Sequence, residues 1–328
     1  MQNRRQALVH TALSATTLIA LPGIVHAQQS ITKIIVPFAP GAGTDAVGRL
    51  VAQKLSDVLG TSVVVDNKTG AGGAIGAKFV ADSAPDGQTL LLAAAPFTTV
   101  PAALSSAGYD PIRQFAPVGM IASGPLVWAV NRDLPVSNMR EFVQLAKSKP
   151  GYFNYGSAGA GGINHLVLEM LKNRAGIFIT HIPYRGIAPA TMDMIGGQIH
   201  LVTGTVPALN AFIKDGRIKA LAVTSSKRSG ALPDVPSMAE SGFAGFDVLN
   251  YFGLMAPKAT PTAVIERMNA ALAKVLVLPE VRARFASDAL EPAFAANSSP
   301  AQLASFIERD FSAWRQVVVA QNLKIDAA

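Results

Sequence analysis

The stretch Ile34–Asp45 reads IIVPFAPGAGTD, an apolar run that breaks into a loop of Pro, Gly and Ala and ends on Thr-Asp. Such a run is typical of a buried strand, and the apolar positions that recur from Val47 to Leu59 predict a helix after the loop. A loop with so few side chains offers a ligand mainly backbone amides. Amides at a helix start carry a partial positive charge, so this unit predicts an α/β fold and an anion site.

Similar units follow along the chain. Short strands are expected at Ser62–Asp66, Thr89–Ala94, Leu126–Val130, Tyr152–Tyr155, Phe178–Pro183, Ile199–Thr203 and Ile218–Val223. Runs that are apolar on both faces and separated by helices indicate parallel sheets built of βαβ units. The segment after Val248–Ala256 is mostly helical and has too few strands for a third α/β domain. We therefore expect two lobes, residues 31–128 with 250–328 and residues 129–249, with a cleft between them and crossings near Trp128 and Asn250.

The N-terminus has the pattern of a secretory signal peptide. Arg4 and Arg5 precede an apolar segment that ends in Val25-His26-Ala27. Pro22 and Gly23 interrupt this segment, which is already short for a membrane-spanning helix. We expect cleavage after Ala27 and release to the periplasm, with the general and the twin-arginine export routes both open.

Composition excludes several classes of protein. The 328 residues carry a net charge of +7 and include no cysteine. Disulfides, thiolate metal sites, a cysteine nucleophile and a lipidated N-terminal cysteine are therefore excluded. Lys and Arg are scattered, without aromatic-interleaved basic runs or zinc spacing, so we expect no nucleic-acid partner, no metal and no cofactor. The mildly basic balance suits an anionic ligand.

Three glycine-rich loops each join a strand to a helix: PGAGTD at 40–45, TGAGG at 69–73 and GSAGAGG at 156–162. One such loop would suggest only a tight turn, whereas three on the same edge of two lobes favour anion binding. None ends in Gly-Lys-Ser/Thr, so a Walker phosphate loop is excluded. Gly70, Gly72 and Gly76 match a dinucleotide fingerprint poorly, because their spacing is one residue too long.

Single residues near these loops admit alternative roles. Asp45 stands four residues before Arg49 at a helix start, which favours an ion pair and a cap over ligand contact. His165 is expected to pack or to bond its loop, because we identify no carboxylate near it in the sequence. Ser157 lacks the leading glycine of a nucleophile elbow, so an exported hydrolase using Ser157 and His165 is the weaker alternative. Tyr184 ends a strand, where a phenol would read the far end of an acid.

Several motifs in series carry a resemblance to a known family. They are IIVPFAPGAGTDAVGR, VVDNKTGAGGAIGA, YGSAGAGGINHLVLE, IPYRG, ALAVTSSKRSGALPDVPSMAESGF and YFGLMAPKATP. In this order and spacing the chain resembles the substrate-binding receptors of tripartite tricarboxylate transporters, often called Bug receptors. The resemblance covers the whole mature chain.

The resemblance implies a type II-like, two-lobed periplasmic receptor of the α/β class, with two parallel or mixed sheets and flanking helices. It implies that a small carboxylic acid is clamped by backbone groups, often through bridging waters, and passed to membrane permease subunits. One jaw would be Ala42, Gly43 and Thr44, and the other would be Ser157, Ala158 and Gly159. The protein would be a monomer and no enzyme. A sensor that signals to a membrane kinase would use the same cleft, and the sequence does not separate sensing from uptake.

The chain departs from the family pattern at two places. Ala42 or Thr44 stands where a further glycine or serine is common, and His200 stands where an acidic residue is common. Thr203 and Thr205 are then the residues expected to contact the distal end of the ligand. The full set of expected ligand-binding residues is Phe38, Gly41, Ala42, Gly43, Thr44, Gly72, Ala95, Ser157, Ala158, Gly159, His165, Tyr184, Gly186, Thr203 and Thr205.

Overall fold

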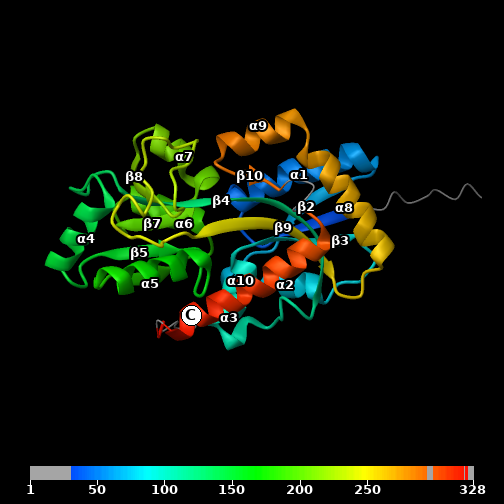
Figure 1. Cartoon of the computed structure of the whole chain (residues 1–328), viewed down its shortest axis with the longest axis horizontal. Coiled ribbons are helices and arrows are strands. Elements are labelled where there is room, and N and C mark those ends of the chain that lie inside the picture. The colour runs from blue at the N-terminus through cyan, green and yellow to red at the C-terminus, as the bar shows by residue number, and fades with distance from the viewer. Residues whose placement is uncertain (1–30, 294–297, 321, 324–328) are drawn as a thin grey trace, which may run out of the picture.

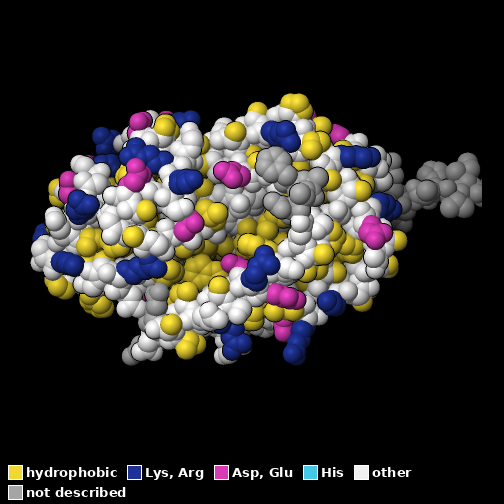
Figure 2. Space-filling model, viewed as in Figure 1, with side chains coloured by type: hydrophobic (Ala, Val, Ile, Leu, Met, Phe, Trp, Pro, Cys, Tyr) yellow, Lys and Arg dark blue, Asp and Glu magenta, His cyan; other side chains and the backbone are white. Residues whose placement is uncertain are grey.

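Two α/β lobes lie side by side in the computed structural model (Figure 1), one carrying α1 (Gly43–Leu59), α8 (Thr262–Leu276) and α9 (Pro279–Ser287) and the other carrying helices α4 to α7, residues 139–214. The structure describes residues 31–293, 298–320 and 322–323, so the signal peptide expected at 1–27 lies outside the described residues. Within those ranges no helix has the length and apolar character needed to cross a membrane. Figure 2 shows basic and acidic side chains interspersed over this face, with hydrophobic side chains gathered in the hollow between the lobes.

The sheet of lobe 1 has the strand order β2-β1-β3-β9-β4, with β10 on the other edge of β4. β1 pairs in parallel with β2 and β3, whereas β9 runs antiparallel to both β3 and β4. The strands are β1 (Thr32–Val36), β2 (Val63–Asn67), β3 (Thr89–Ala94), β4 (Phe115–Asn131), β9 (Leu249–Pro257) and β10 (Glu291–Pro292). The sheet is therefore mixed, with its parallel part at the N-terminal strands.

The sheet of lobe 2 uses the second part of β4. Its order is β8-β4-β7-β5-β6, in which β5 is parallel to β6 and β7 while β4 is antiparallel to β7 and β8. The further strands are β5 (Asn154–Ser157), β6 (Thr180–Pro183), β7 (Leu201–Thr205) and β8 (Ile218–Val223). β4 changes its neighbours between Pro125, which pairs with β9, and Leu126, which pairs with β7. One continuous strand thus belongs to both lobes.

Helices cover both faces of each sheet. They are α1 (Gly43–Leu59), α2 (Ala74–Ala81), α3 (Pro96–Ala103), α4 (Met139–Ser148), α5 (Ile163–Ala175), α6 (Ile187–Ile195), α7 (Val206–Lys214), α8 (Thr262–Leu276), α9 (Pro279–Ser287) and α10 (Pro300–Ala320), with short 3₁₀ turns at Ala71–Gly73 and Ser105–Ala107. Along β1 the side chains alternate, since Ile34 joins the core under α1 and α8 while Ile35 joins the core under α2, α3 and α10. Both faces of the strand are thereby buried at these positions, which explains its apolar run Ile34–Val36.

The core under α1 follows from the spacing of its residues. Val47, Val51 and Leu55 recur every four positions and are fully or almost fully buried, so they form one stripe of the helix. They belong to the same buried cluster as Leu272 and Val275 of α8. α1 begins at Gly43, four residues earlier than the apolar pattern from Val47 predicts, and its first turn is therefore part of the glycine-rich loop.

The strands predicted at Thr89–Ala94 and Ile218–Val223 agree with β3 and β8, but the strand predicted at Leu126–Val130 was too short. β4 extends back to Phe115 through Pro117 and Gly119, residues that normally interrupt strands. The structure places a register shift between Pro117 and Gly119 and another between Met120 and Ala122. A bulge leaves one residue out of the ladder, so a strand can accommodate such residues without ending.

Candidate functional site

A small cavity of about 40 Å³ lies between the lobes, and we call it the cradle. Its wall consists of Phe38, Ala42, Gly43, Thr44, Ala94, Pro96, Leu126, Ala158, Ile163, Asn164, Ile187, Thr205 and Asn250. A single water needs about 10–15 Å³ measured in this way, so the cradle has room for a group the size of a carboxylate. It is too small for a whole acid of the size of hexanoate or citrate.

Helix N-termini from both lobes converge on the cradle. α1 of lobe 1 contributes Gly43 and Thr44, and α5 of lobe 2 contributes Ile163 and Asn164. The first amides of a helix have no partner within the helix, and the helix dipole adds partial positive charge at the same end. α3, α6 and α7 also begin at the cradle wall. The arrangement favours an anion without using a charged side chain.

Among the polar side chains of the wall, Asn250 in β9 is the one with an unpaired buried donor among the described residues. It is 3% exposed, and its Oδ1 accepts a hydrogen bond from the amide of Ala95 at 3.1 Å. Its Nδ2 has no hydrogen-bond partner among the described residues. An unpaired buried donor is costly, so Nδ2 is a candidate ligand donor. In the part of the chain that the structure describes, the cradle wall contains no Lys, Arg, His, Asp or Glu.

Asp45 supports the first loop from behind. Its Oδ2 accepts hydrogen bonds from the amide of Gly41 at 2.9 Å and from Arg49 Nε at 2.8 Å, and its Oδ1 accepts from Asn67 Nδ2 at 2.9 Å. Burial alone would raise the pKa of Asp45, but the hydrogen bonds from Arg49, Gly41 and Asn67 outweigh it and hold the pKa below its ordinary value. The predicted ion pair with Arg49 is confirmed. Asp45 fixes the loop and does not line the cradle.

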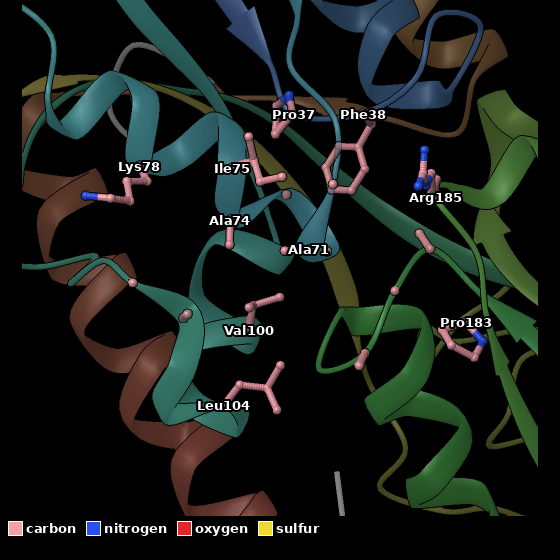
Figure 3. Close-up of a pocket in the computed structure, with 18 of the residues that line it drawn as sticks. Pro37, Phe38, Ala71, Ala74, Ile75, Lys78, Val100, Leu104, Pro183 and Arg185 are labelled. Carbon is pink, nitrogen blue, oxygen red and sulfur yellow. The ribbon is translucent and has the colours of Figure 1, made fainter. Parts of the chain in front are cut away.

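A larger cavity of about 580 Å³ adjoins the cradle, and we call it the chamber (Figure 3). Phe38 and Ala158 belong to the walls of both cavities. The chamber lies between the second glycine-rich loop of lobe 1 and the loops that follow β5 and β6 of lobe 2. Its wall consists of Pro37, Phe38, Gly70, Ala71, Gly72, Gly73, Ala74, Ile75, Lys78, Val100, Leu104, Ser106, Ala107, Gly108, Ala158, Gly159, Ala160, Pro183, Tyr184 and Arg185.

The loop after β5 is held by the hydroxyl of Ser157. Ser157 Oγ lies 3.1 Å from both the amide nitrogen and the carbonyl oxygen of Gly159, and 2.6 Å from His181 Nε2. Ser157 is fully buried and lines neither cavity. Because its hydroxyl is bonded to Gly159 and His181 and the residue lines neither cavity, it is not placed to attack a substrate there. The histidine that contacts Ser157 is His181, and not His165 as the hydrolase alternative assumed.

His165 belongs to a cluster behind the same loop. Its Nδ1 accepts a hydrogen bond from the amide of Gly161 at 3.1 Å, and its ring stacks on His181 with centroids 3.7 Å apart. Burial, with a smaller contribution from Lys172, lowers the pKa of His165 to about 4. The statement that no carboxylate lies near it was wrong: Glu169, one helical turn later, is 3.8 Å from Nε2. The expectation of a loop-bonded histidine is confirmed.

The structure divides the predicted site residues into three groups. The cradle or chamber wall contains Phe38, Ala42, Gly43, Thr44, Gly72, Ala158, Gly159, Tyr184 and Thr205. Gly41, Ala95 and Gly186 adjoin these residues without lining either cavity, and Ser157, His165 and Thr203 lie behind the walls. Ala42 lines the cradle, but its amide is already bonded to Ala39 O at 3.1 Å.

The residues that the sequence predicts to contact the distal end of the ligand do not lie where such contacts would need them. Thr205 lies in the cradle itself, and Thr203 is fully buried, with its carbonyl oxygen accepting from Asn164 Nδ2. Tyr184 does line the chamber, but its hydroxyl donates to Asp193 Oδ2 at 2.8 Å. Burial and this carboxylate raise the pKa of Tyr184 to about 12. Sequence reasoning missed Asn250, which lies at an expected crossing, and Leu104, which lies in a segment for which no element was predicted.

The fold and the paired helix N-termini define a class: a two-lobed α/β solute-binding protein with its site between the lobes. Residues 47–323 match the model of the tripartite tricarboxylate transporter family receptor. The chain belongs to this family. It is a solute-binding receptor and not an enzyme, and the family is periplasmic.

Relatives of known identity agree with this assignment. The chain is 34% identical to Protein BugT of Bordetella pertussis over 328 residues, which are 95% of this chain and 100% of that protein. It is similar to the structure of the periplasmic binding protein BugD, with 34% identity, a TM-score of 0.86 and coverage of 90% of this chain and 98% of BugD. An R. palustris protein with adipate has 32% identity, a TM-score of 0.86 and coverage of 90% and 98%.

Proposed function

We propose that this receptor captures a small carboxylic acid, with its carboxylate in the cradle, and presents it to the membrane permease subunits of a tripartite transporter. The observation that carries the proposal is the convergence of α1 and α5, from different lobes, on one cavity whose described wall has no charged side chain. Two helix N-termini favour an anion, and their free amides match the acceptor oxygens of a carboxylate. The R. palustris protein similar to this chain holds a dicarboxylate, adipate.

Asn250 adds a donor at the cradle. Its Oδ1 is fixed by the Ala95 amide, which leaves the Nδ2 group as the part of the side chain able to bind an oxygen of the ligand or of a bridging water. Hydrogen bonds to a charged acceptor contribute about 1.5–3 kcal/mol each. A few such bonds from amides and Asn250 offset part of the entropic cost of binding, and burial of the rest of the acid must supply the remainder.

The division into lobes 31–128 with 250–328 and 129–249 remains part of this proposal. Support comes from β4, which changes its pairing between Pro125 and Leu126, and from β9, which begins at Leu249. We expect these two strands to flex when the lobes open and close. The export signal at residues 1–27 and a monomeric state complete the proposal, because a freely diffusing periplasmic receptor needs both release from the membrane and access to its cleft.

Thermal unfolding with a panel of acids tests this function. Acetate, hexanoate, succinate, adipate and citrate are compared with glucose and lysine, and at least one acid should raise the Tm because it binds only the folded state. An absence of any shift with the acids, together with a shift for glucose or lysine, would reject the proposal. Native mass spectrometry of protein purified without denaturation would identify an acid that copurifies.

Asn250→Asp provides the site-directed test. The change keeps the size and the acceptor for Ala95 but replaces the donor by a negative charge, so the affinity for the best acid should fall at least about a hundredfold. Thr260→Val is the matched control, because Thr260 Oγ1 is likewise buried without a partner in the described chain but lies outside the cradle. Equal affinities of Asn250→Asp and the control would place the carboxylate elsewhere.

A further inference from the structure

The chamber differs chemically from the cradle that it adjoins. Its wall is built from alanine, glycine and proline residues together with the larger apolar side chains of Phe38, Ile75, Val100 and Leu104. Figure 3 shows Val100 and Leu104 directed from lobe 1 toward the facing loop of lobe 2. At about 580 Å³ the chamber falls in the size range of small-molecule sites. A mainly apolar cavity of this size suits the body of a ligand and not its charge.

The polar residues of the chamber are engaged with other groups or lie at its exposed rim. Lys78 points away from the cavity in Figure 3, and its Nζ pairs with Asp82 Oδ2 at 2.8 Å. The hydroxyl of Tyr184 is bonded to Asp193. Arg185 is exposed to solvent, where a guanidinium interacts weakly with a charge because water and salt screen it. Among the described residues of the wall, no cation is buried in the chamber.

The two cavities together determine how an acid is oriented. The cradle has a volume of about 40 Å³, so it admits a carboxylate and leaves the rest of the molecule outside. Phe38 and Ala158 are shared by both walls, and the body of the acid therefore extends past them into the chamber. A second carboxylate at that end would lose part of its hydration against the apolar side chains and find no buried cation among the described wall residues, which is unfavourable.

We propose that the ligand is a monocarboxylic acid with an apolar aliphatic or aromatic body, held by its carboxylate in the cradle and by its body in the chamber. This inference rests on the proposed function, because it assumes that a carboxylate occupies the cradle. It goes further in assigning the class of acid. Dicarboxylic acids of the same length bind more weakly to this receptor.

Matched pairs of acids test the assignment by calorimetry on the mature protein. Hexanoate and adipate have the same chain length and differ in one terminal group, so hexanoate should bind at least about tenfold more tightly. In the series acetate, butyrate, hexanoate, each buried methylene should improve the affinity about fourfold. Adipate binding as tightly as hexanoate, or affinity that does not change along the series, would overturn the inference. Failure of every acid to bind would instead reject the proposed function.

Two variants locate the body of the acid. Leu104→Gln should weaken hexanoate binding about tenfold while leaving acetate binding unchanged, because acetate does not reach the chamber. Arg185→Gln should change hexanoate binding less than twofold. Val277→Gln, at an exposed apolar position at the end of α8, is the control for the polar substitution. Unchanged hexanoate binding in Leu104→Gln, or a tenfold loss in Arg185→Gln, would show that the chamber does not hold the body.

Discussion

Gly43 and Thr205 meet across the cleft so closely that a Cβ atom at position 43 would lie 2.2 Å from Thr205 Oγ1. Gly43 opens α1 of lobe 1, and Thr205 caps the start of α7 in lobe 2. A similar approach occurs at Gly72 and Gly159, where a Cβ on Gly159 would lie 3.0 Å from the backbone of Gly72. The lobes therefore touch through glycines at two places, and the cradle is complete only when the lobes are closed.

Gly43→Ala tests this dependence on closure. The substitution keeps the amide and suits a helix start, so the fold should be retained, but the methyl group collides with Thr205 and holds the lobes apart. The affinity for the best acid should fall about tenfold or more, and small-angle scattering with that acid at saturation should give a larger radius of gyration than the wild type does.

Combining Thr205→Ala with Gly43→Ala in one chain should relieve the collision. Thr205→Ala removes Oγ1 and leaves the Cβ, which would lie at an ordinary 3.4 Å from the new methyl group. The double variant should recover most of the affinity, giving a coupling energy of about 1 kcal/mol or more in the double-mutant cycle. Additive losses would mean that Gly43 acts through its flexibility and not through the contact with Thr205.

Asp310 in α10 should make the stability fall as the pH rises. Burial raises the pKa of Asp310 to about 6, although hydrogen bonds from Thr98 and Trp314 oppose the shift. The folded state then binds a proton more tightly than the unfolded state does, so this contribution is full below about pH 4 and is lost as the pH passes about 6. Asp310→Asn should remove the decline and add roughly 1–3 kcal/mol at pH 7. Chemical denaturation between pH 4 and 8 measures the free energy of unfolding of both proteins. If the two proteins show the same dependence on pH, Asp310 is not the cause of the decline.

His165 should act with the opposite sign. Its pKa is lowered to about 4 by burial first and by Lys172 second, so the folded state excludes a proton that the unfolded chain accepts below about pH 6.5. The stability present above pH 6.5 is lost as the pH falls toward 4, by up to roughly 3 kcal/mol. His165→Gln should remove this loss. The pH range of this effect overlaps that of Asp310, so both proteins are compared in the Asp310→Asn background. If His165→Gln does not change how the free energy of unfolding depends on pH below 6.5 in that background, the prediction is wrong.

Sequence alone predicted the elements whose residues are uniform and missed those whose role depends on distant partners. The mainly apolar runs of β3 and β8 were assigned with correct bounds, whereas Pro117 and Gly119 concealed more than half of β4. Glu169 could have been found, since it lies one helical turn after His165. The pairing of Ser157 with His181 depends on the register of β5 against β6, which no local pattern reveals.

The cradle was predicted only in part, because only some of its residues belong to a local sequence pattern. The glycine-rich loops identified Gly43, Thr44 and Ala158, because backbone amides at helix starts have a sequence signature. Asn250 has none, since a single Asn in an apolar strand indicates nothing until Ala95 and the cradle are seen beside it. Leu104, the residue that follows α3, was missed because this helix, which contains Pro101, was not predicted.

Ala158→Pro separates backbone from side chain in the loop after β5. Ala158 lines both the cradle and the chamber, and a proline there removes a hydrogen-bond donor without adding charge. If that amide binds the carboxylate, the affinity should fall roughly ten- to a hundredfold, as expected for a charge-assisted bond of about 1.5–3 kcal/mol. The preceding residue lies in a strand, the conformation that proline favours before it, so circular dichroism should show a retained fold.

Ser157→Ala is the matched comparison and should behave in the opposite way. Its hydroxyl holds Gly159 and His181 and does not reach the cavities, so its loss should lower the free energy of unfolding by about 1–3 kcal/mol but change the affinity little. Calorimetry gives the affinities of both variants, and urea denaturation gives their stabilities. Near-normal affinity in the proline variant would exclude the Ala158 amide as a donor, and the free amides of Ile163 and Asn164 at the start of α5 would then be the lobe 2 donors to test next.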